Sequence, residues 1–291
     1  MKRIGRILIF LLLSVGAVVM IYPFLFSVLA GLFDKKEFQN LGRLLPIPTN
    51  PVMDSYRAFF QSGLLRPFAN TVTRSLWYGV LITGFAVMIG YIMSRLNFKG
   101  KNALFYFIIC ANMIPGVLTL IPTYVEMARL PFLGGNNWTG FGGSGLIDHP
   151  AVLYVLLSPG YVVWIYLFRQ SMNSLPKDYE EAAYIDGSGF FRTIFRVIIP
   201  IQVPIIVTVF INVVLATWND FMTPFIYVNT PSYTTLPGYV GTLVASLQQV
   251  GDRNYPLIFA LSTMSVLPPV LIFLFLQRYI VQGFANAGIK G

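Results

Sequence analysis

Long apolar segments alternate with shorter polar segments along the chain. Residues 7–31 contain no charged side chain, and about 20 apolar residues in a helix suffice to cross the hydrocarbon core of a membrane. Non-helical backbone cannot face lipid, so each apolar run of this length predicts a helix. The pattern therefore predicts an all-α integral membrane protein with one transmembrane domain over residues 1–291. Six spans are expected at about residues 7–31, 70–94, 104–128, 151–170, 202–228 and 256–277.

The first span follows a basic start, as in a signal peptide. Its apolar run is longer than the roughly 7 to 15 residues of a signal-peptide core. Tyr22, Pro23 and Phe24 stand where a small-residue cleavage site would be. We therefore expect an uncleaved first span.

A polar segment, residues 171–200, separates the fourth and fifth predicted spans. Pro176 suits the first turn of a helix. Carboxylates complement the positive end of the helix dipole, and three follow this proline, at Asp178, Glu180 and Glu181. The segment therefore predicts a short helix that begins near residue 177.

The same segment contains a predicted turn and a second short helix. Gly187 can adopt the left-handed conformation that ends a helix, and the second helix is expected to run to Val197. Pro200 is expected to open the fifth span. An interfacial linker is the simpler interpretation, but Ala182 and Ala183 form a small-residue patch that permits close approach by another protein. We therefore favour a docking helix.

Three further segments are predicted to connect spans on the outer side. Residues 32–69 are expected to form a short helix around residues 53–60. Residues 131–150 are rich in glycine and asparagine, which predicts an irregular loop. Residues 229–255 are expected to form a third loop.

The composition agrees with a membrane protein, because only 11% of the residues are charged whereas a soluble domain has about a quarter. Lysine and arginine predominate in cytoplasmic segments of membrane proteins. With the N-terminus inside, twelve basic residues lie in inner segments: Lys2, Arg3, Arg6, Arg95, Lys99, Lys101, Arg169, Lys177, Arg192, Arg196, Arg278 and Lys290. Eight lie in outer segments: Lys35, Lys36, Arg43, Arg57, Arg66, Arg74, Arg129 and Arg253. This bias favours cytoplasmic N- and C-termini. The net charge of +9 then reflects the orientation of the chain in the membrane. Nucleic acid is not an expected partner, because no basic cluster with interleaved aromatic residues is present.

Residues that could carry catalysis or bind a cofactor are sparse. The single cysteine, Cys110, lies in an apolar stretch and is expected in the core. The single histidine, His149, has no second histidine or cysteine nearby, so no metal site is expected. Gly100-Lys101 is followed by Asn102, and the chain lacks the G-x-x-x-x-G-K-[ST] nucleotide loop. We therefore expect no enzymatic activity and no cofactor bound by this chain.

The polar segment resembles the EAA signature of permease subunits of binding-protein-dependent ABC importers. The family pattern is EAA, three residues, glycine, nine residues and I-x-L-P. It is matched by Glu181-Ala182-Ala183 and Gly187, and Val197-Ile198-Ile199-Pro200 departs from its last part only by the conservative changes of isoleucine to valine and leucine to isoleucine. Trp218-Asn219-Asp220-Phe221 and the C-terminal residues 277–291 are similar to the smaller permease subunit of maltose-type sugar importers. The resemblance implies the type I ABC importer permease fold.

The resemblance also implies partners. The EAA helix would dock on a dimer of ATP-binding subunits, which hold ATP and Mg²⁺. Its candidate coupling residues are Glu180, Glu181, Ala182, Ala183, Asp186, Gly187 and Pro200. The C-terminal tail would also reach the ATPase, through Gly288, Lys290 and Gly291. A second, different permease subunit would complete the pathway, and residues 229–255 would approach an extracytoplasmic solute-binding protein. The chain would lie in membrane lipid, in the cytoplasmic (inner) membrane of a bacterium or archaeon.

Polar residues within the predicted spans are candidates for a substrate pathway. They are Trp218, Asn219, Asp220 and Asn112, although helix contacts or a gate near the outer interface are our preferred interpretation of the first three. Arg74 is expected to be an interfacial anchor, with attraction of an acidic sugar as the alternative.

The expected substrate is a carbohydrate, in particular an oligosaccharide. Glycerol phosphate and an acidic oligosaccharide are alternative substrates. A secondary transporter would show matched, interrupted half-repeats, and none is apparent. A membrane enzyme would need clustered acids or histidines at an interface, and the only acidic cluster, in the polar segment, fits a docking helix better.

Overall fold

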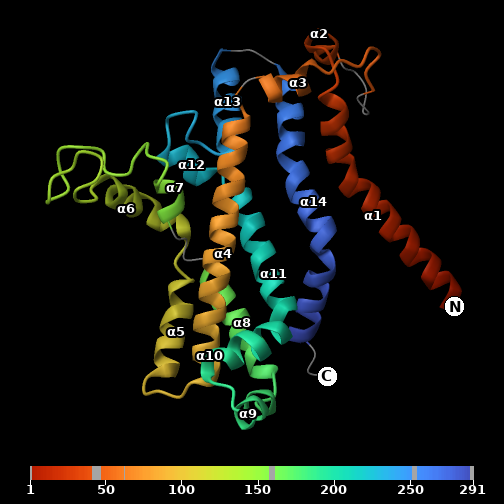
Figure 1. Cartoon of the computed structure of the whole chain (residues 1–291). Coiled ribbons are helices and arrows are strands. Elements are labelled where there is room, and N and C mark those ends of the chain that lie inside the picture. The colour runs from red at the N-terminus through yellow and green to blue at the C-terminus, as the bar shows by residue number, and fades with distance from the viewer. Residues whose placement is uncertain (1, 41–46, 62, 157–160, 251–253, 289–291) are drawn as a thin grey trace.

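The computed structural model describes residues 2–40, 47–61, 63–156, 161–250 and 254–288, and these ranges contain helices but no strand (Figure 1). The long helices are α1 (Lys2–Ala30), α4 (Leu65–Arg95), α11 (Ile199–Trp218) and α14 (Tyr255–Gly288). The shorter ones are α2 (Lys35–Gln39), α3 (Asp54–Gln61), α5 (Lys101–Ala111), α6 (Gly116–Ala128), α7 (Val152–Val155), α8 (Val162–Ser174), α9 (Asp178–Ile185), α10 (Phe190–Thr193), α12 (Met222–Tyr227) and α13 (Leu236–Val250).

Four helical segments of the described chain are long and apolar enough to cross a membrane. They are Gly5–Ala30, Leu65–Arg95, Phe190–Trp218 and Tyr255–Tyr279. Each overlaps one of the predicted spans, although Phe190–Trp218 begins twelve residues before its span, and the all-α membrane fold is confirmed. A bent helix pair could supply a fifth crossing. The count of six spans stays a prediction.

The third predicted span, residues 104–128, is not one straight helix. It is divided into α5 and α6, whose axes are bent by 91°. Pro115 stands at the start of α6 with φ −59° and ψ 129°. Proline has no N–H to donate and disfavours helical backbone at the preceding residue, here Ile114. The prediction of one continuous helix over this span is wrong, because it treated this proline as tolerable within a helix.

The fourth and fifth predicted spans are also divided. Residues 151–170 contain α7 and the first part of α8, and residues 157–160 lie outside the described structure. Residues 202–228 contain most of α11 and all of α12, with a break after Trp218.

Pro200 lies in the first turn of α11, as predicted, but no break separates α11 from the helix before it. The helix that begins at Phe190 continues as far as Trp218. It passes through a π-helical turn, Ile194–Ile198, in which the Ile199 N–H donates to the Ile194 carbonyl. A π-turn changes the hydrogen-bond register locally, which accommodates the missing N–H of Pro200 in the first turn of α11.

The core of the bundle lies between α4, α8 and α11. Tyr78, Ile165 and Val209 are buried there, each contributed by a different helix. Close approach of α4 to α8 depends on Gly90, because a Cβ atom at this position would lie 2.9 Å from the ring of Phe168. The spacing of these helices is therefore set by a residue without a side chain.

The bundle has two distinct ends (Figure 1). The end that bears α9 also contains the last turn of α4, the first turn of α5 and the end of α8, and we call it the α9 end. The opposite end contains α2, α3 and α13, and we call it the α13 end. A buried cluster joins α3, α13 and α14 at the α13 end and consists of Phe59, Leu64, Leu236 and Leu261.

Two predictions concern the α13 end. The short helix expected around residues 53–60 is confirmed as α3. Residues 229–255, expected as a connecting loop, contain a helix that the sequence pattern did not predict, because α13 occupies fifteen of these residues. The first residue of that helix, Leu236, is fully buried, and its N–H donates to the hydroxyl of Thr71 on α4 (2.8 Å). Contact with the bundle thus orders a segment that is too short to be read as a span.

The first helix diverges from the rest of the bundle (Figure 1). It contacts α14 near its C-terminal end, where the Ser27 hydroxyl lies within hydrogen-bond distance of the Phe259 carbonyl (3.3 Å) and the Thr263 hydroxyl (3.0 Å). In the segment that could cross a membrane, none of the most apolar window is buried within the chain. Its apolar surface therefore faces lipid or another protein.

Candidate functional site

α9 is the outermost helix at the α9 end (Figure 1). Its last turn closes with two hydrogen bonds, from Ser188 N to the Ala183 carbonyl (2.9 Å) and from Gly187 N to the Tyr184 carbonyl (3.0 Å). Gly187 has φ +76°, so the predicted left-handed glycine is confirmed. α10 then begins after Gly189, so the predicted turn between two helices is confirmed, but the second helix continues into α11 and does not end near Val197.

Most of the predicted coupling residues lie on the exposed part of α9. Glu181, Ala182 and Asp186 are exposed, and Ala183 is half-buried. An apolar side chain is exposed beside them, because Ile185 retains 86% of its accessible surface. Pro200 lies apart from them, in α11. The exposed surface of α9 thus combines acidic, small and apolar groups, a mixture suited to contact with another protein.

Glu180 differs from its neighbour Glu181, because its side chain turns toward the bundle. Its Oε1 accepts a hydrogen bond from Nε of Arg95, the last residue of α4 (2.6 Å). The side chains of Arg95 and Glu180 retain 6% and 10% of their accessible surface. Nη2 of Arg95 also donates to the Leu175 carbonyl (2.9 Å). This buried ion pair fixes the start of α9 to the end of α4, so Glu180 does not belong to the exposed surface.

Apolar contacts continue this connection into the bundle. The ring of Phe190 on α10 meets the ring of Tyr91 on α4 edge to face, with centroids 5.8 Å apart. Ile198, in the π-helical turn, is buried in one cluster with Phe168 and Met172 of α8. α9 is therefore connected, through α10 and the π-helical turn, to α4 and α8.

A second buried ion pair lies deeper in the bundle. Nη2 of Arg74 on α4 is 2.7 Å from Oδ2 of Asp220, and Nε of Arg74 donates to the Leu153 carbonyl (3.0 Å). The side chains of Arg74 and Asp220 retain 3% and 26% of their accessible surface. The other oxygen of Asp220 accepts from the N–H of Thr223 in α12 (3.1 Å). Arg74 is therefore not an interfacial anchor, and the pair holds the break between α11 and α12 against α4.

The remaining pathway candidates occupy different environments. The indole N–H of Trp218 donates to the Ser265 carbonyl on α14 (3.0 Å), and its buried ring packs edge to face on Phe68. Asn219 and Asn112 are exposed, at the ends of α11 and α5. The structure therefore brings Trp218 and Asp220 into helix contacts and leaves two amide side chains exposed.

Residues 131–150 form an irregular segment, as predicted, and a carboxylate anchors its end. Oδ1 of Asp148 accepts from the N–H groups of Asn229 (2.8 Å) and Thr230 (2.7 Å), and Oδ2 accepts from the Thr230 hydroxyl (2.7 Å). Burial raises the pKa of Asp148, but these hydrogen bonds outweigh it and hold the pKa below its ordinary value of 3.8. The carboxylate therefore stays ionised at neutral pH and links this segment to the one that follows α12.

Three predictions concern single residues elsewhere. Gly288 is the last residue of α14, whereas Lys290 and Gly291 lie outside the described residues. Nδ1 of His149 accepts from the N–H of Ala151 (3.2 Å). Cys110 is exposed, so its expected place in the core is wrong.

The comparisons with known proteins concern almost the whole chain. It is 28% identical over 298 residues to the arabinooligosaccharides transport system permease protein AraQ of Halalkalibacterium halodurans, with 100% of both chains covered. It is 29% identical to AraQ of Bacillus subtilis, covering 99% of this chain and 96% of the relative. It is 27% identical to the galactooligosaccharides transport system permease protein GanQ of Bacillus subtilis, covering 100% and 98%.

A solved structure supports the fold. The chain is similar to a chain in the crystal structure of a bacterial ABC transporter involved in the import of the acidic polysaccharide alginate, with a TM-score of 0.73. The two are 19% identical, and the match covers 96% of this chain and 97% of that chain. This likeness concerns the fold alone.

The family comparison includes Arg95, Glu180 and Asp220 of the two buried ion pairs, whereas Arg74 precedes the matched region. Residues 86–286 match the family model described as binding-protein-dependent transport system inner membrane component. The matched region runs from within α4 almost to the end of α14, which is more than half of the chain. The protein is thus a member of the family of binding-protein-dependent transport system inner membrane components.

Proposed function

We propose that this chain is a permease subunit that forms, with a second and different permease subunit, the membrane pathway of an ABC importer for an oligosaccharide. The observation that carries the proposal is the full-length similarity to permeases named for arabino- and galactooligosaccharides. The fold, the EAA pattern and the exposed α9 surface support it. The chain itself would form part of the membrane pathway for the substrate and would catalyse no reaction.

The exposed surface of α9 is the proposed contact with the partner ATPase. Glu181, Ala182 and Asp186 would face the ATP-binding subunits, with Gly187 closing the helix. ATP and Mg²⁺ would be bound by these partner subunits. Glu180 would act by holding α9 to α4 through Arg95, and Gly288, Lys290 and Gly291 stay proposed as a second contact. The helical contacts that lead from α9 into the bundle support this assignment.

We propose that the chain spans the cytoplasmic membrane with the α9 end inside. The excess of lysine and arginine in the segments assigned to this side supports the orientation. Residues 229–255, which contain α13, would then approach the extracytoplasmic solute-binding protein. Asn219 and Asn112 remain the pathway candidates with exposed amide groups.

Reconstitution of the whole importer tests the proposal. The chain would be co-expressed with candidate partner permease, ATPase and binding-protein subunits, purified as a complex and placed in proteoliposomes. We expect uptake of a labelled arabino- or galactooligosaccharide that requires ATP and the binding protein. Glycerol phosphate and an acidic oligosaccharide serve as competing substrates. Uptake driven by an ion gradient without the ATPase would contradict the proposal.

A further inference from the structure

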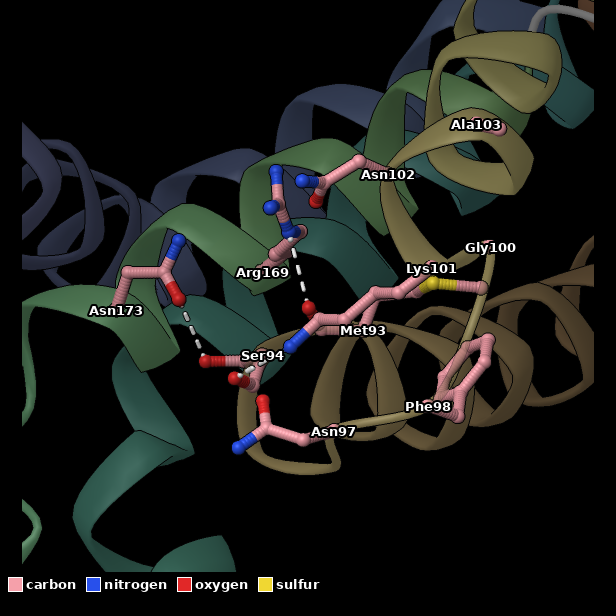
Figure 2. Close-up of a pocket in the computed structure, with 10 residues that line it drawn as sticks. All are labelled: Met93, Ser94, Asn97, Phe98, Gly100, Lys101, Asn102, Ala103, Arg169 and Asn173. Atoms are coloured by element: carbon pink, nitrogen blue, oxygen red, sulfur yellow. Dashed lines mark hydrogen bonds between the residues drawn. The ribbon is translucent and has the colours of Figure 1, made fainter.

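A cavity of about 450 Å³ opens at the α9 end, between the last turn of α4, the first turn of α5 and the end of α8 (Figure 2). Its lining is mostly polar and consists of Met93, Ser94, Asn97, Phe98, Gly100, Lys101, Asn102, Ala103, Arg169 and Asn173. None of these residues belongs to the α9 surface or to the two buried ion pairs. The cavity is therefore a separate feature of the molecule.

Two cations in this lining have no carboxylate partner. Nζ of Lys101 donates to the Ser94 carbonyl (3.1 Å), and Nε of Arg169 donates to the Met93 carbonyl (3.1 Å). The guanidinium of Arg169 also lies over the ring of Phe105, 3.8 Å from its centroid. Within the described ranges, neither cation forms an ion pair. Carbonyl oxygens orient these groups, but no negative charge balances them.

Burial and neighbouring positive charges both act on Lys101. Partial burial, together with the nearby charges of Arg169 and Lys177, lowers the pKa of Lys101 from its ordinary value. Like charges at one site repel each other, and a bound anion would relieve the repulsion. The electrostatics of the cavity therefore favour an anionic ligand.

Hydrogen-bond donors accompany the cations. Asn97 and Asn102 line the cavity with exposed side chains (Figure 2). α5 begins here after Gly100, without a side chain that caps its N–H groups. Lysine, arginine and amide donors together suit the oxygens of a phosphate group.

The surroundings of the cavity are typical of a membrane interface. Phe98 lines the cavity and is exposed, and Tyr106 and Phe107 are exposed further along α5. Tyr166 on α8 is also exposed and stacks on Phe105. Tyrosine side chains such as Tyr106 and Tyr166 are enriched at the boundary between headgroups and acyl chains. An amphipathic ligand could thus place its polar group in the cavity and its apolar part along α5.

We propose that this cavity binds the phosphate headgroup of an anionic phospholipid of the inner leaflet. Lys101 and Arg169 would contact the phosphate, and the acyl chains would lie against the exposed face of α5. Basic pockets between membrane helices on the cytoplasmic side bind such headgroups. The proposal uses the orientation proposed above, but it does not depend on the transported substrate.

Lipid binding to the assembled importer tests the proposal. The complex would be purified in a neutral detergent and titrated with phosphatidylglycerol or with phosphatidylcholine of the same acyl chains, and bound lipid would be counted by native mass spectrometry. We expect tighter binding of phosphatidylglycerol. Lys101→Gln should weaken that binding about fivefold, because one cation near an anionic lipid contributes about 1 kcal/mol. Asn102→Asp, which adds a carboxylate to the lining, should weaken it as well.

Lys99→Gln is the matched control, because Lys99 is exposed two positions from Lys101 and does not line the cavity. It should leave the preference for phosphatidylglycerol unchanged. An unchanged thermal midpoint in phosphatidylcholine shows that each variant is folded. Equal binding of both lipids, an equal loss in Lys99→Gln, or displacement of the lipid by inorganic phosphate at a similar concentration would overturn the proposal. Because no transport is measured, these outcomes leave the proposed substrate untouched.

Discussion

Arg74 and Asp220 are 146 positions apart in the sequence, yet their side chains form a buried ion pair between α4 and the break after α11. Asp220→Asn would leave the guanidinium buried without a counter-charge. An uncompensated buried charge costs about 3 to 5 kcal/mol. We therefore expect this variant to lower the thermal midpoint of the purified importer strongly, as measured by intrinsic fluorescence during heating.

Asn219→Ala is the control for this prediction, since Asn219 is the exposed neighbour and its change should shift the midpoint little. The double variant Arg74→Gln with Asp220→Asn removes both charges. It should be more stable than Asp220→Asn alone, because no unpaired charge remains buried. Equal midpoints for Asp220→Asn and Asn219→Ala would show that the pair contributes no stability.

At the residue scale, the sequence could predict what depends on neighbours in the chain. The left-handed conformation of Gly187 could be predicted, because this glycine follows a short helical pattern and glycine adopts positive φ without steric cost. The roles of Glu180 and Arg95 could not be predicted, because their contact joins positions 85 apart in the sequence. Adjacent glutamates look equivalent in a sequence, and only the packing of α9 on α4 separates an inward residue from an outward one.

At the element scale, the two glutamates of α9 should have separable effects. Glu180→Gln removes the charge that balances Arg95, so it should lower the thermal midpoint of the complex. Glu181→Gln changes an exposed group, so it should leave the midpoint nearly unchanged and weaken retention of the ATPase. Heating curves and the amount of co-purified ATPase measure the two effects. Equal loss of stability in both variants would contradict the inward assignment of Glu180.

The turn between α9 and α10 offers a test of backbone conformation. Gly187 has a positive φ, and a Cβ atom there would meet nothing within 4 Å, so Gly187→Ala introduces strain without a clash. The strain costs about 1 kcal/mol and should reduce the uptake obtained per ATP hydrolysed. Gly189→Ala is the matched control, because Gly189 has φ −77° and equal free space. The coupling ratio in proteoliposomes should fall only for Gly187→Ala.

The breaks in the predicted spans have local and non-local causes. Pro115 lies between α5 and α6, and the effect of a proline on helical backbone can be stated from sequence alone. α13 could not be predicted in the same way, because its place depends on Leu236 packing beneath α3 and α14 and on the hydrogen bond from its N–H to Thr71. Apolar run length is therefore a good guide to long spans and a poor one to short helices at their ends.

For the whole molecule, the orientation of the chain can be tested with its single cysteine as the starting point. In a Cys110→Ser background, Ser144→Cys and Lys99→Cys place one thiol each at exposed sites in segments assigned to opposite sides. A membrane-impermeant maleimide should label Ser144→Cys in intact cells. Lys99→Cys should react only after permeabilisation. The reverse pattern would invert the orientation, together with the proposed inner position of α9 and of the lipid cavity.

The π-helical turn at Ile194–Ile198 affects the orientation of α9 relative to α11. An α-helix advances by about 100° per residue, so one residue more or less in this turn rotates everything on one side of it relative to the other by about that angle. Deleting a single residue there would leave every side chain of α9 and α11 intact and still turn the α9 surface toward a different neighbour. The number of residues in this turn therefore sets the direction in which the α9 surface points, whatever the identity of those residues.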